Sequence, residues 1–187
     1  IAVIAALYSM NINSVTAEKK TGTLTSIKEG LVYSFSHPII RMLIIFTAVS
    51  SVFGWSYSTV MPLIAANEFH LDAAGLGYMY AAGGLGALSA TLLIGLFSKK
   101  VSSVYFILGG NTLFSVCIIL FSFTTNLTLA LVLLFFAGFG LLSQFAMINT
   151  TIQRLVKSEF RGRVLSIYIF MFMGLTPLGN FEVGLLS

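Results

Sequence analysis

Long stretches without a single charged residue are the feature that most constrains this sequence. They cover residues 42–67, 73–98, 101–153 and 164–181, the last continuing past Glu182 to the end of the chain. A helix needs about 20 apolar residues to cross roughly 30 Å of hydrocarbon. The stretch 101–153 is long enough for two helices, and polar residues 124–126 divide it. The sequence therefore predicts an all-α, polytopic transmembrane helical bundle with full spans at about residues 39–66, 73–98, 101–123, 128–153 and 164–187.

The amount of charge supports a chain that is surrounded by lipid. Only 9% of the residues are charged and 57% are hydrophobic, whereas about 25% of the residues of a soluble domain are charged. The formal net charge of +4 does not indicate nucleic acid as a partner, because the basic residues form short clusters between the apolar stretches. The expected surroundings are a lipid bilayer.

The basic residues also predict the orientation of the spans. All ten lie in or beside the first, third and fifth connections: Lys19, Lys20, Lys28, Arg41, Lys99, Lys100, Arg154, Lys157, Arg161 and Arg163. The second and fourth connections, at residues 67–72 and 124–127, contain no Lys or Arg. Because basic loops stay on the cytoplasmic side, the odd-numbered connections are predicted to be cytoplasmic. The chain is expected to be an integral, multi-pass membrane protein.

The first 38 residues read as the end of one helix and a linker. Residues 1–10 are apolar but too short to span, so we expect them to be the end of a helix that begins upstream. The sequence stops at Ser187 without a polar tail, and we expect truncation at both ends. Residues 11–38 are expected to form a cytoplasmic linker before the first full span.

Within this linker, the spacing of Ser26 and Glu29 is that of a capping box, which would start a short helix through about Ser36. Its apolar side would rest on the membrane surface, through Leu31, Val32 and Phe35. A plain linker without a helix fits the same residues equally well.

Polar and aromatic side chains at mid-span are the first candidates for a substrate cavity, because unpaired polar groups facing lipid cost free energy. Trp55, Tyr57 and Thr59 lie deep in the first span, just before Pro62. Pro62 leaves a backbone carbonyl free near Ser58, and a Ser or Thr hydroxyl can bond to it. Packing against neighbouring helices, or anchoring near the membrane interface, is the alternative for the two aromatic residues.

A second group of cavity candidates lies on the fourth span. Gln144, Met147 and Thr151 share one helix face by their three- and four-residue spacing, and Gln144 is the preferred substrate contact. Asn149 and Gln153 lie nearer the cytoplasmic end, where we expect them to form hydrogen bonds between helices.

Small residues indicate where helices pack closely or bend. Ala82, Gly86 and Ala90 repeat every four positions on the second span, which allows a neighbouring backbone to approach. Further packing or kink positions are predicted on the last span, at Gly174, Pro177 and Gly179, and at Pro62 on the first.

The residues expected of an enzyme are not grouped in this sequence. His37 and His70 lie in connections on opposite sides, Cys117 has no histidine partner, and Glu182 is close to the external surface. Acid–base and metal chemistry need clustered ionisable groups, and no phosphate-binding Gly-rich loop occurs. We therefore expect no catalytic residues, no metal site, no cofactor and no enzymatic activity.

Three stretches resemble the tenth-to-eleventh helix region of the major facilitator superfamily. They are Asn149-Thr-Thr-Ile-Gln153, Arg161-Gly-Arg-Val-Leu-Ser-Ile-Tyr168 and Gly174-Leu-Thr-Pro-Leu-Gly179. The resemblance extends back through residues 75–95 and 53–62, and it is strongest to the efflux branch that includes the enterobactin exporter. It implies the carboxy-terminal half of a transporter, from the end of helix six through most of helix eleven, without the amino-terminal half and helix twelve.

The resemblance also implies a function. Two six-helix bundles would rock about a central site and move a small molecule by alternating access, as an efflux antiporter with protons as the coupling ion. A cytoplasmic gate is expected at Glu159, Arg161, Gly162, Arg163 and Ser166, where an ion pair made in one state would bias the equilibrium. Determination of topology by positive charge explains the same arginines. A non-transporting membrane scaffold or receptor is the alternative function.

Overall fold

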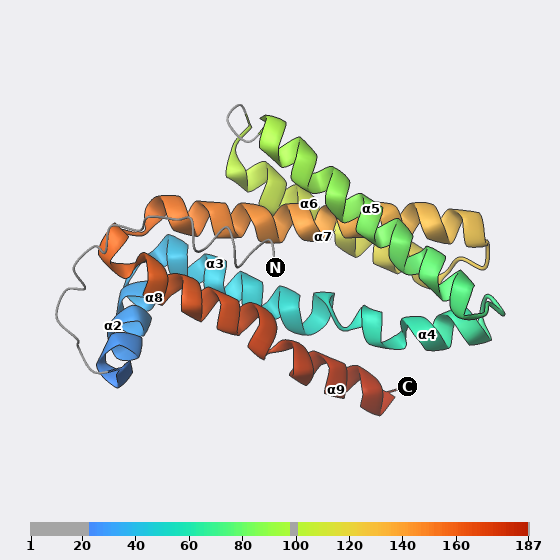
Figure 1. The fold of residues 1–187 in the computed structure, drawn as a ribbon, viewed down its shortest axis with the longest axis horizontal. Coiled ribbons are helices and arrows are strands. Elements are labelled where there is room, and N and C mark those ends of the chain that lie inside the picture. The colour runs from blue at the N-terminus through green and yellow to red at the C-terminus, as the bar shows by residue number, and fades with distance from the viewer. Residues whose placement is uncertain (1–22, 98–100, 187) are drawn as a thin grey trace, which may run out of the picture.

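The computed structural model describes residues 23–97 and 101–186, and every element in these ranges is helical (Figure 1). The expected half-span at residues 1–10 lies outside the described residues, as do Lys19, Lys20, Lys99 and Lys100. The elements are α2 (Thr23–Ser36), α3 (Pro38–Val49), η1 (Ser50–Gly54), α4 (Tyr57–Asn67), α5 (Ala73–Phe97), α6 (Ser103–Ser122), α7 (Leu127–Leu155), α8 (Ser158–Ile169), η2 (Phe170–Gly174) and α9 (Thr176–Leu186).

Five helices of the described chain are long and apolar enough to cross a membrane, which confirms the predicted fold class. They are Pro38–Asn67, Ala73–Phe97, Ser103–Ser122, Leu127–Leu155 and Ser158–Leu185. The fifth span begins at Ser158 instead of near residue 164, because α8 starts directly after the short link formed by Val156 and Lys157. Backbone hydrogen bonds do not require apolar side chains, so the charged residues expected in a loop form the first turns of α8.

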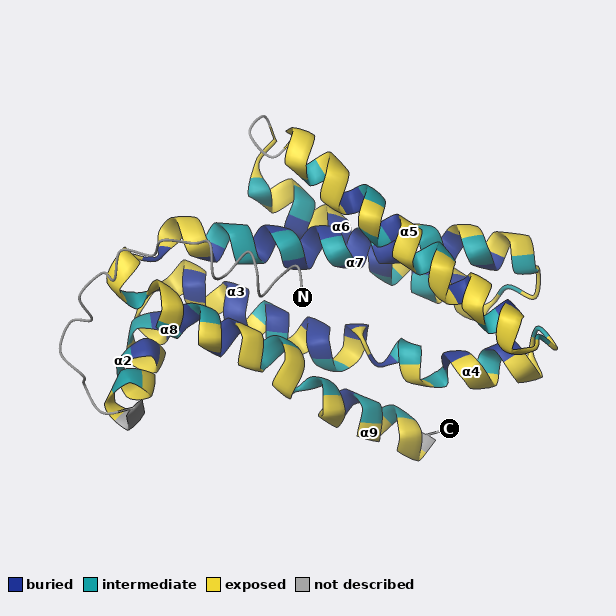
Figure 2. Cartoon of the chain, in the orientation of Figure 1, coloured by how far each residue is buried: buried dark blue, intermediate teal, exposed yellow. Residues whose placement is uncertain are grey.

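The helix α7 is the centre of the bundle. It is the most buried span and packs against both α5 and α6, as the dark blue residues along it show (Figure 2). The contact with α5 depends on Gly86, since a Cβ atom there would collide with the carbonyl oxygen of Phe135. A Cβ on Gly138 would likewise collide with the backbone of Gly83. These glycines let two helix backbones touch, and they hold α5 and α7 together as one unit.

Two apolar clusters divide the core along the length of the bundle. One lies at the end formed by α4 and includes Met61, Met79 and Leu134. The other lies at the end formed by α3 and α8 and includes Ile44 and Ile148. Large apolar side chains are also exposed all around the outside of the bundle. This outward-facing apolar surface is what a bilayer requires.

The linker does form a helix, but the capping box was a wrong prediction. Ser26 lies inside α2, whose helical hydrogen bonding already includes Thr23, so the Ser26 hydroxyl is not at an N-cap. Glu29 does not fold back on the helix start and instead pairs with Arg163 on α8. Val32 and Phe35 are exposed. The helix α2 therefore packs on α8 with one side and leaves an apolar side uncovered.

Candidate functional site

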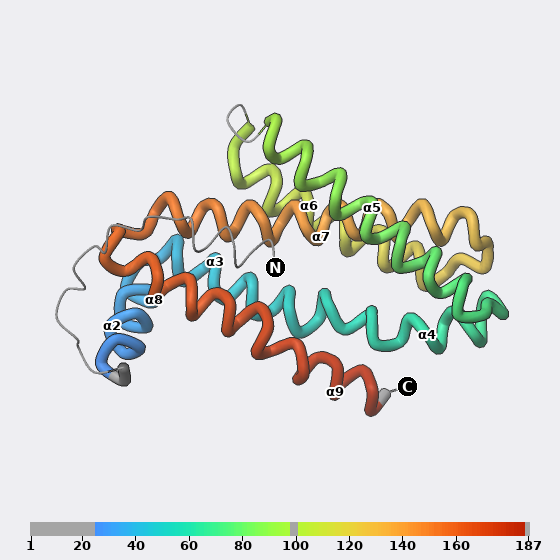
Figure 3. Tube along the Cα trace, in the orientation of Figure 1, coloured from blue at the N-terminus to red at the C-terminus, as the bar shows by residue number. Residues whose placement is uncertain are grey.

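Two of the five spans are interrupted in the middle. The first span passes from α3 through η1 to α4, and the fifth passes from α8 through η2 to α9, where η1 and η2 are single π-helical turns. Each turn ends on a glycine, Gly54 and Gly174, and the chain bends before the next helix begins (Figure 3). Such turns inside α-helices are frequent at functional sites.

The two interruptions are joined by hydroxyl groups. The Ser51 hydroxyl donates to the carbonyl oxygen of Phe172 at 2.5 Å and lies 3.1 Å from the Thr176 hydroxyl. Thr176 donates to the same Phe172 carbonyl at 2.9 Å. A carbonyl that lacks its helical partner is thus satisfied from both spans. A Cβ on Gly179 would collide with the carbonyl oxygen of Val52, so the two backbones also touch here.

The contact continues along α4 and α9. The Thr59 hydroxyl donates to the amide oxygen of Asn180 at 2.9 Å. The Trp55 ring lies edge-on to the Phe172 ring, with 5.8 Å between the ring centroids. Ser51, Thr176 and Asn180 were not predicted from the sequence, although each is a polar residue inside an otherwise apolar stretch.

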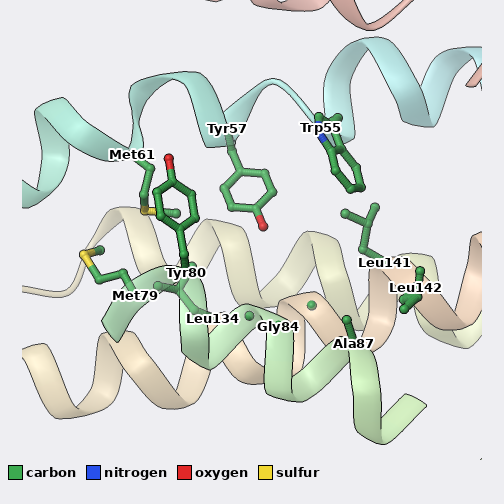
Figure 4. A pocket seen from close by; sticks show the side chains of 12 residues that line it. Trp55, Tyr57, Met61, Met79, Tyr80, Gly84, Ala87, Leu134, Leu141 and Leu142 are labelled. Atoms are coloured by element: carbon green, nitrogen blue, oxygen red, sulfur yellow. The ribbon is translucent and has the colours of Figure 1, made fainter. Parts of the chain in front are cut away.

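A cavity of about 190 Å³ opens beside these interruptions, between α4, α5 and α7. Trp55 and Tyr57 form one wall, Tyr80 rises from α5 opposite them, and the sulfur-bearing side chains of Met61 and Met79 close one end (Figure 4). Glycine and leucine residues of α5 and α7 form the remaining wall. No Asp, Glu, Lys, Arg or His is among the described residues that line the cavity.

Tyr80 links the cavity to the proline kink. Its hydroxyl donates to the Ser58 carbonyl oxygen at 3.1 Å, which is the carbonyl that Pro62 leaves without a helical N–H. The sequence predicted a Ser or Thr hydroxyl in this role, but the Ser58 hydroxyl donates to the Trp55 carbonyl instead. A tyrosine from the neighbouring helix therefore holds α4 against α5 at its bend.

The six predicted cavity residues fall in different places. Trp55 and Tyr57 line the cavity, whereas Thr59 faces α9. Gln144 and Met147 are fully buried between helices, away from the cavity wall. The Thr151 hydroxyl donates to the Met147 carbonyl oxygen at 2.7 Å, within its own helix.

Gln144 is an unusual buried group. Its side chain is 0% exposed, and neither its amide nitrogen nor its amide oxygen has a hydrogen-bond partner among the described residues. The neighbouring Ser143 hydroxyl is also buried without a partner there. Asn149 and Gln153, expected to bond between helices, instead bond to each other along α7.

At the α3–α8 end, the helix α2 is fastened to α8 by a charged and aromatic contact. The Arg163 guanidinium lies 2.6 Å from a carboxylate oxygen of Glu29 and 5.5 Å from the centroid of the Phe160 ring. Tyr33 stacks on Phe160 with 4.5 Å between ring centroids. A Cβ on Gly30 would lie 2.9 Å from the Arg163 Cβ, so the helices approach closely.

The other predicted gate residues lie around this contact without forming it. Glu159, Arg161 and Gly162 are exposed, and within residues 23–97 and 101–186 no ion pair involves Glu159 or Arg161. The Ser166 hydroxyl donates to the Gly162 carbonyl oxygen at 2.9 Å, one turn back on α8. The acidic partner of Arg163 comes from a different helix, which spacing along the sequence does not reveal.

Comparison with known proteins supplies the family. A family model described as a transmembrane secretion effector, within the major facilitator superfamily, matches residues 1–187. No curated protein and no solved structure matches the chain. The chain therefore belongs to the transmembrane secretion effector family of the major facilitator superfamily, a family of membrane transporters and not of enzymes.

Proposed function

We propose that this chain provides the carboxy-terminal bundle of a secondary active transporter that moves a small molecule out of the cell by alternating access. The observation that carries the proposal is the joint between the two interrupted spans, in which Ser51 and Thr176 share the Phe172 carbonyl. Helices that bend at mid-membrane beside a cavity supply what alternating access needs, a site near the midplane and segments that can tilt about it.

The joint suggests which parts move. On one side of it, α3 and α8 pack with α7 in a continuous apolar cluster and carry α2. On the other side, α4 and α9 are held to each other by Thr59 and Asn180. We expect α4 and α9 to tilt together about the joint, while α5, α6 and α7 form a fixed frame.

Direction and coupling follow from the efflux branch that the sequence resembles. Export as a proton antiporter is proposed on that basis, in the bacterial inner membrane with α2 on the cytoplasmic side. In this arrangement α2 belongs to the linker that leads to an amino-terminal half. The exposed side chains of Ile27 and Val32 support an α2 that lies against the membrane surface.

The test is transport by the full-length protein reconstituted into vesicles with an imposed pH gradient. Protein-dependent substrate movement that follows the gradient is the expected result. Movement that is indifferent to the gradient removes the proton coupling and leaves transport. If no substrate moves, and cysteines placed on α4 keep one constant accessibility to a water-soluble thiol reagent, the protein is a scaffold or receptor instead.

A further inference from the structure

We propose that the cavity between α4, α5 and α7 holds an uncharged, ring-sized apolar group that carries a hydrogen-bond acceptor. This inference rests on the proposed transport function, because it names the chemical class of the substrate. It is carried by the size of the cavity, its lining, and one hydroxyl group that the protein itself leaves unused.

The size of the cavity fits a single ring. Its volume is about 190 Å³, and an apolar cavity of about 150 Å³ in a protein interior accepts benzene. The faces of Trp55 and Tyr57 and the thioethers of Met61 and Met79 surround this space. Aromatic faces and polarisable sulfur atoms both pack favourably against a flat ring.

The lining favours a neutral group over a cation. Three aromatic side chains, Trp55, Tyr57 and Tyr80, could attract a cation through their ring faces. However, no carboxylate lies among the described lining residues to replace the water that a cation would lose. Removing an ion from water without a counter-charge costs more than ring faces return. An uncharged occupant avoids that cost.

The need for a hydrogen-bond acceptor on the occupant follows from the hydroxyl groups of Tyr57 and Tyr80. The Tyr80 hydroxyl is already donated to the Ser58 carbonyl. The Tyr57 hydroxyl points from α4 toward α5 and α7 (Figure 4), and it has no hydrogen-bond partner in the described part of the chain. Tyr57 is half-buried, and its hydroxyl is free to donate to a carbonyl or ether oxygen of an occupant, as single placed polar groups do in largely apolar ligand pockets.

The glycines of α5 provide a matched pair of variants. Gly84 lines the cavity, and a Cβ built on it meets no atom within 4 Å. A Cβ on Gly77, on the same helix but away from the cavity, also meets nothing within 4 Å. Gly84→Leu should therefore fill the cavity, while Gly77→Leu changes helix propensity by the same amount and leaves the cavity open.

The experiment measures binding by ¹⁹F NMR to the full-length protein in detergent, with four probes of one ring each. They are 4-fluoroacetophenone (neutral, with an acceptor), 1-ethyl-4-fluorobenzene (neutral, without one), 4-fluoro-N,N,N-trimethylanilinium (a cation) and 4-fluorobenzoate (an anion). The acetophenone should bind most tightly. Tyr57→Phe should weaken it about five-fold, the effect of one lost hydrogen bond, and Gly84→Leu should weaken it at least about ten-fold. Gly77→Leu should not change it.

The tightest binding by either charged probe, or unchanged acetophenone binding in Gly84→Leu, would overturn the proposal. If Gly84→Leu does not purify as a single species, the Tyr57→Phe comparison between the two neutral probes decides the matter alone, since only the acetophenone should weaken. Because binding in detergent does not require transport, probe binding without vesicle transport counts against the proposed function only. Transport without probe binding counts against this inference only.

Discussion

The Ser51 hydroxyl and the Phe172 carbonyl oxygen, 121 positions apart in sequence, lie 2.5 Å from each other at the point where the first and the fifth span are both interrupted. Ser51 is completely buried. The hydrogen bond therefore ties two helix interruptions together, and its donor side chain is shielded from solvent.

Replacing Ser51 with alanine should loosen this joint. The loss of one buried hydrogen bond costs about 1 kcal/mol, and Thr176 still satisfies the Phe172 carbonyl. We expect a small loss of thermal stability in detergent and a clear fall in the transport rate of the full-length protein. The control is Ser50→Ala, in the same π-helical turn. Equal transport by both variants would show that the joint has no part in the motion.

Replacing Gly86 with alanine should separate α5 from α7. The new methyl group would collide with the Phe135 carbonyl oxygen, which belongs to backbone and cannot turn away. Overpacking of this kind costs about 1–3 kcal/mol or more, so thermal unfolding in detergent should begin several degrees earlier. The same change at Gly95 meets no atom within 4 Å and should be neutral. Similar melting curves for both would contradict the close approach.

Exchanging the charges of Glu29 and Arg163 tests the contact between α2 and α8. The side chains are 40% and 32% exposed, respectively, and pairs this accessible contribute about 0–1 kcal/mol. Glu29→Arg alone should therefore leave stability nearly unchanged and shift the ratio of inward- to outward-open states by up to about five-fold. Distances between spin labels on α4 and on α7, which the proposed motion changes, report that ratio.

Adding Arg163→Glu to Glu29→Arg should restore the original ratio of states. Glu159→Gln, which removes an exposed charge without an ion pair in the described chain, is the control and should have no effect. If the single and double exchanges behave alike, the arginine acts only through its positive charge on the cytoplasmic side.

Replacing Gln144 with leucine should stabilise the protein. Both polar atoms of its side chain are buried without partners among the described residues, and an apolar side chain of similar size removes that cost, about 1–3 kcal/mol. Transport should fall, because a group kept at such cost is expected to serve another state of the cycle or the substrate. Met147→Leu, also fully buried on α7, should change neither quantity. A less stable Gln144→Leu variant would reveal a hidden partner.

The spans could be predicted from sequence because the lipid bilayer restricts which segments can cross it. Any segment such as residues 73–97 that crosses hydrocarbon must be helical, apolar and long enough. The start of the fifth span was placed too late, since Glu159 and Arg161 are helical despite their charge. Apolar length marks the part of a helix that lies in lipid and does not mark where its hydrogen bonding begins.

The first interruption and the partners of both interruptions could not be predicted, although Gly174 and Pro177 marked the last span as a place for packing or a kink. Residues 50–54 read as ordinary helix, and the π-helical turn is stabilised by Phe172 and Thr176 from another span. The Ser26–Glu29 spacing fits a capping box locally, yet the tertiary contact with Arg163 determines where Glu29 points. Short-range sequence patterns predict the backbone conformation of a single segment. The π-helical turn and the direction of the Glu29 side chain depend on contacts with a second segment that is distant in sequence.

Trp55 contacts both the interrupted fifth span and the cavity, because its ring stands at 85° to the Phe172 ring and the residue also lines the cavity. It is also the single tryptophan of the 187-residue chain. The maximum of its fluorescence emission should therefore shift both when a ligand enters the cavity and when the fifth span bends. In a protein that keeps Trp55 as its only tryptophan, this natural fluorophore would let the transport cycle be followed in real time without attaching a dye.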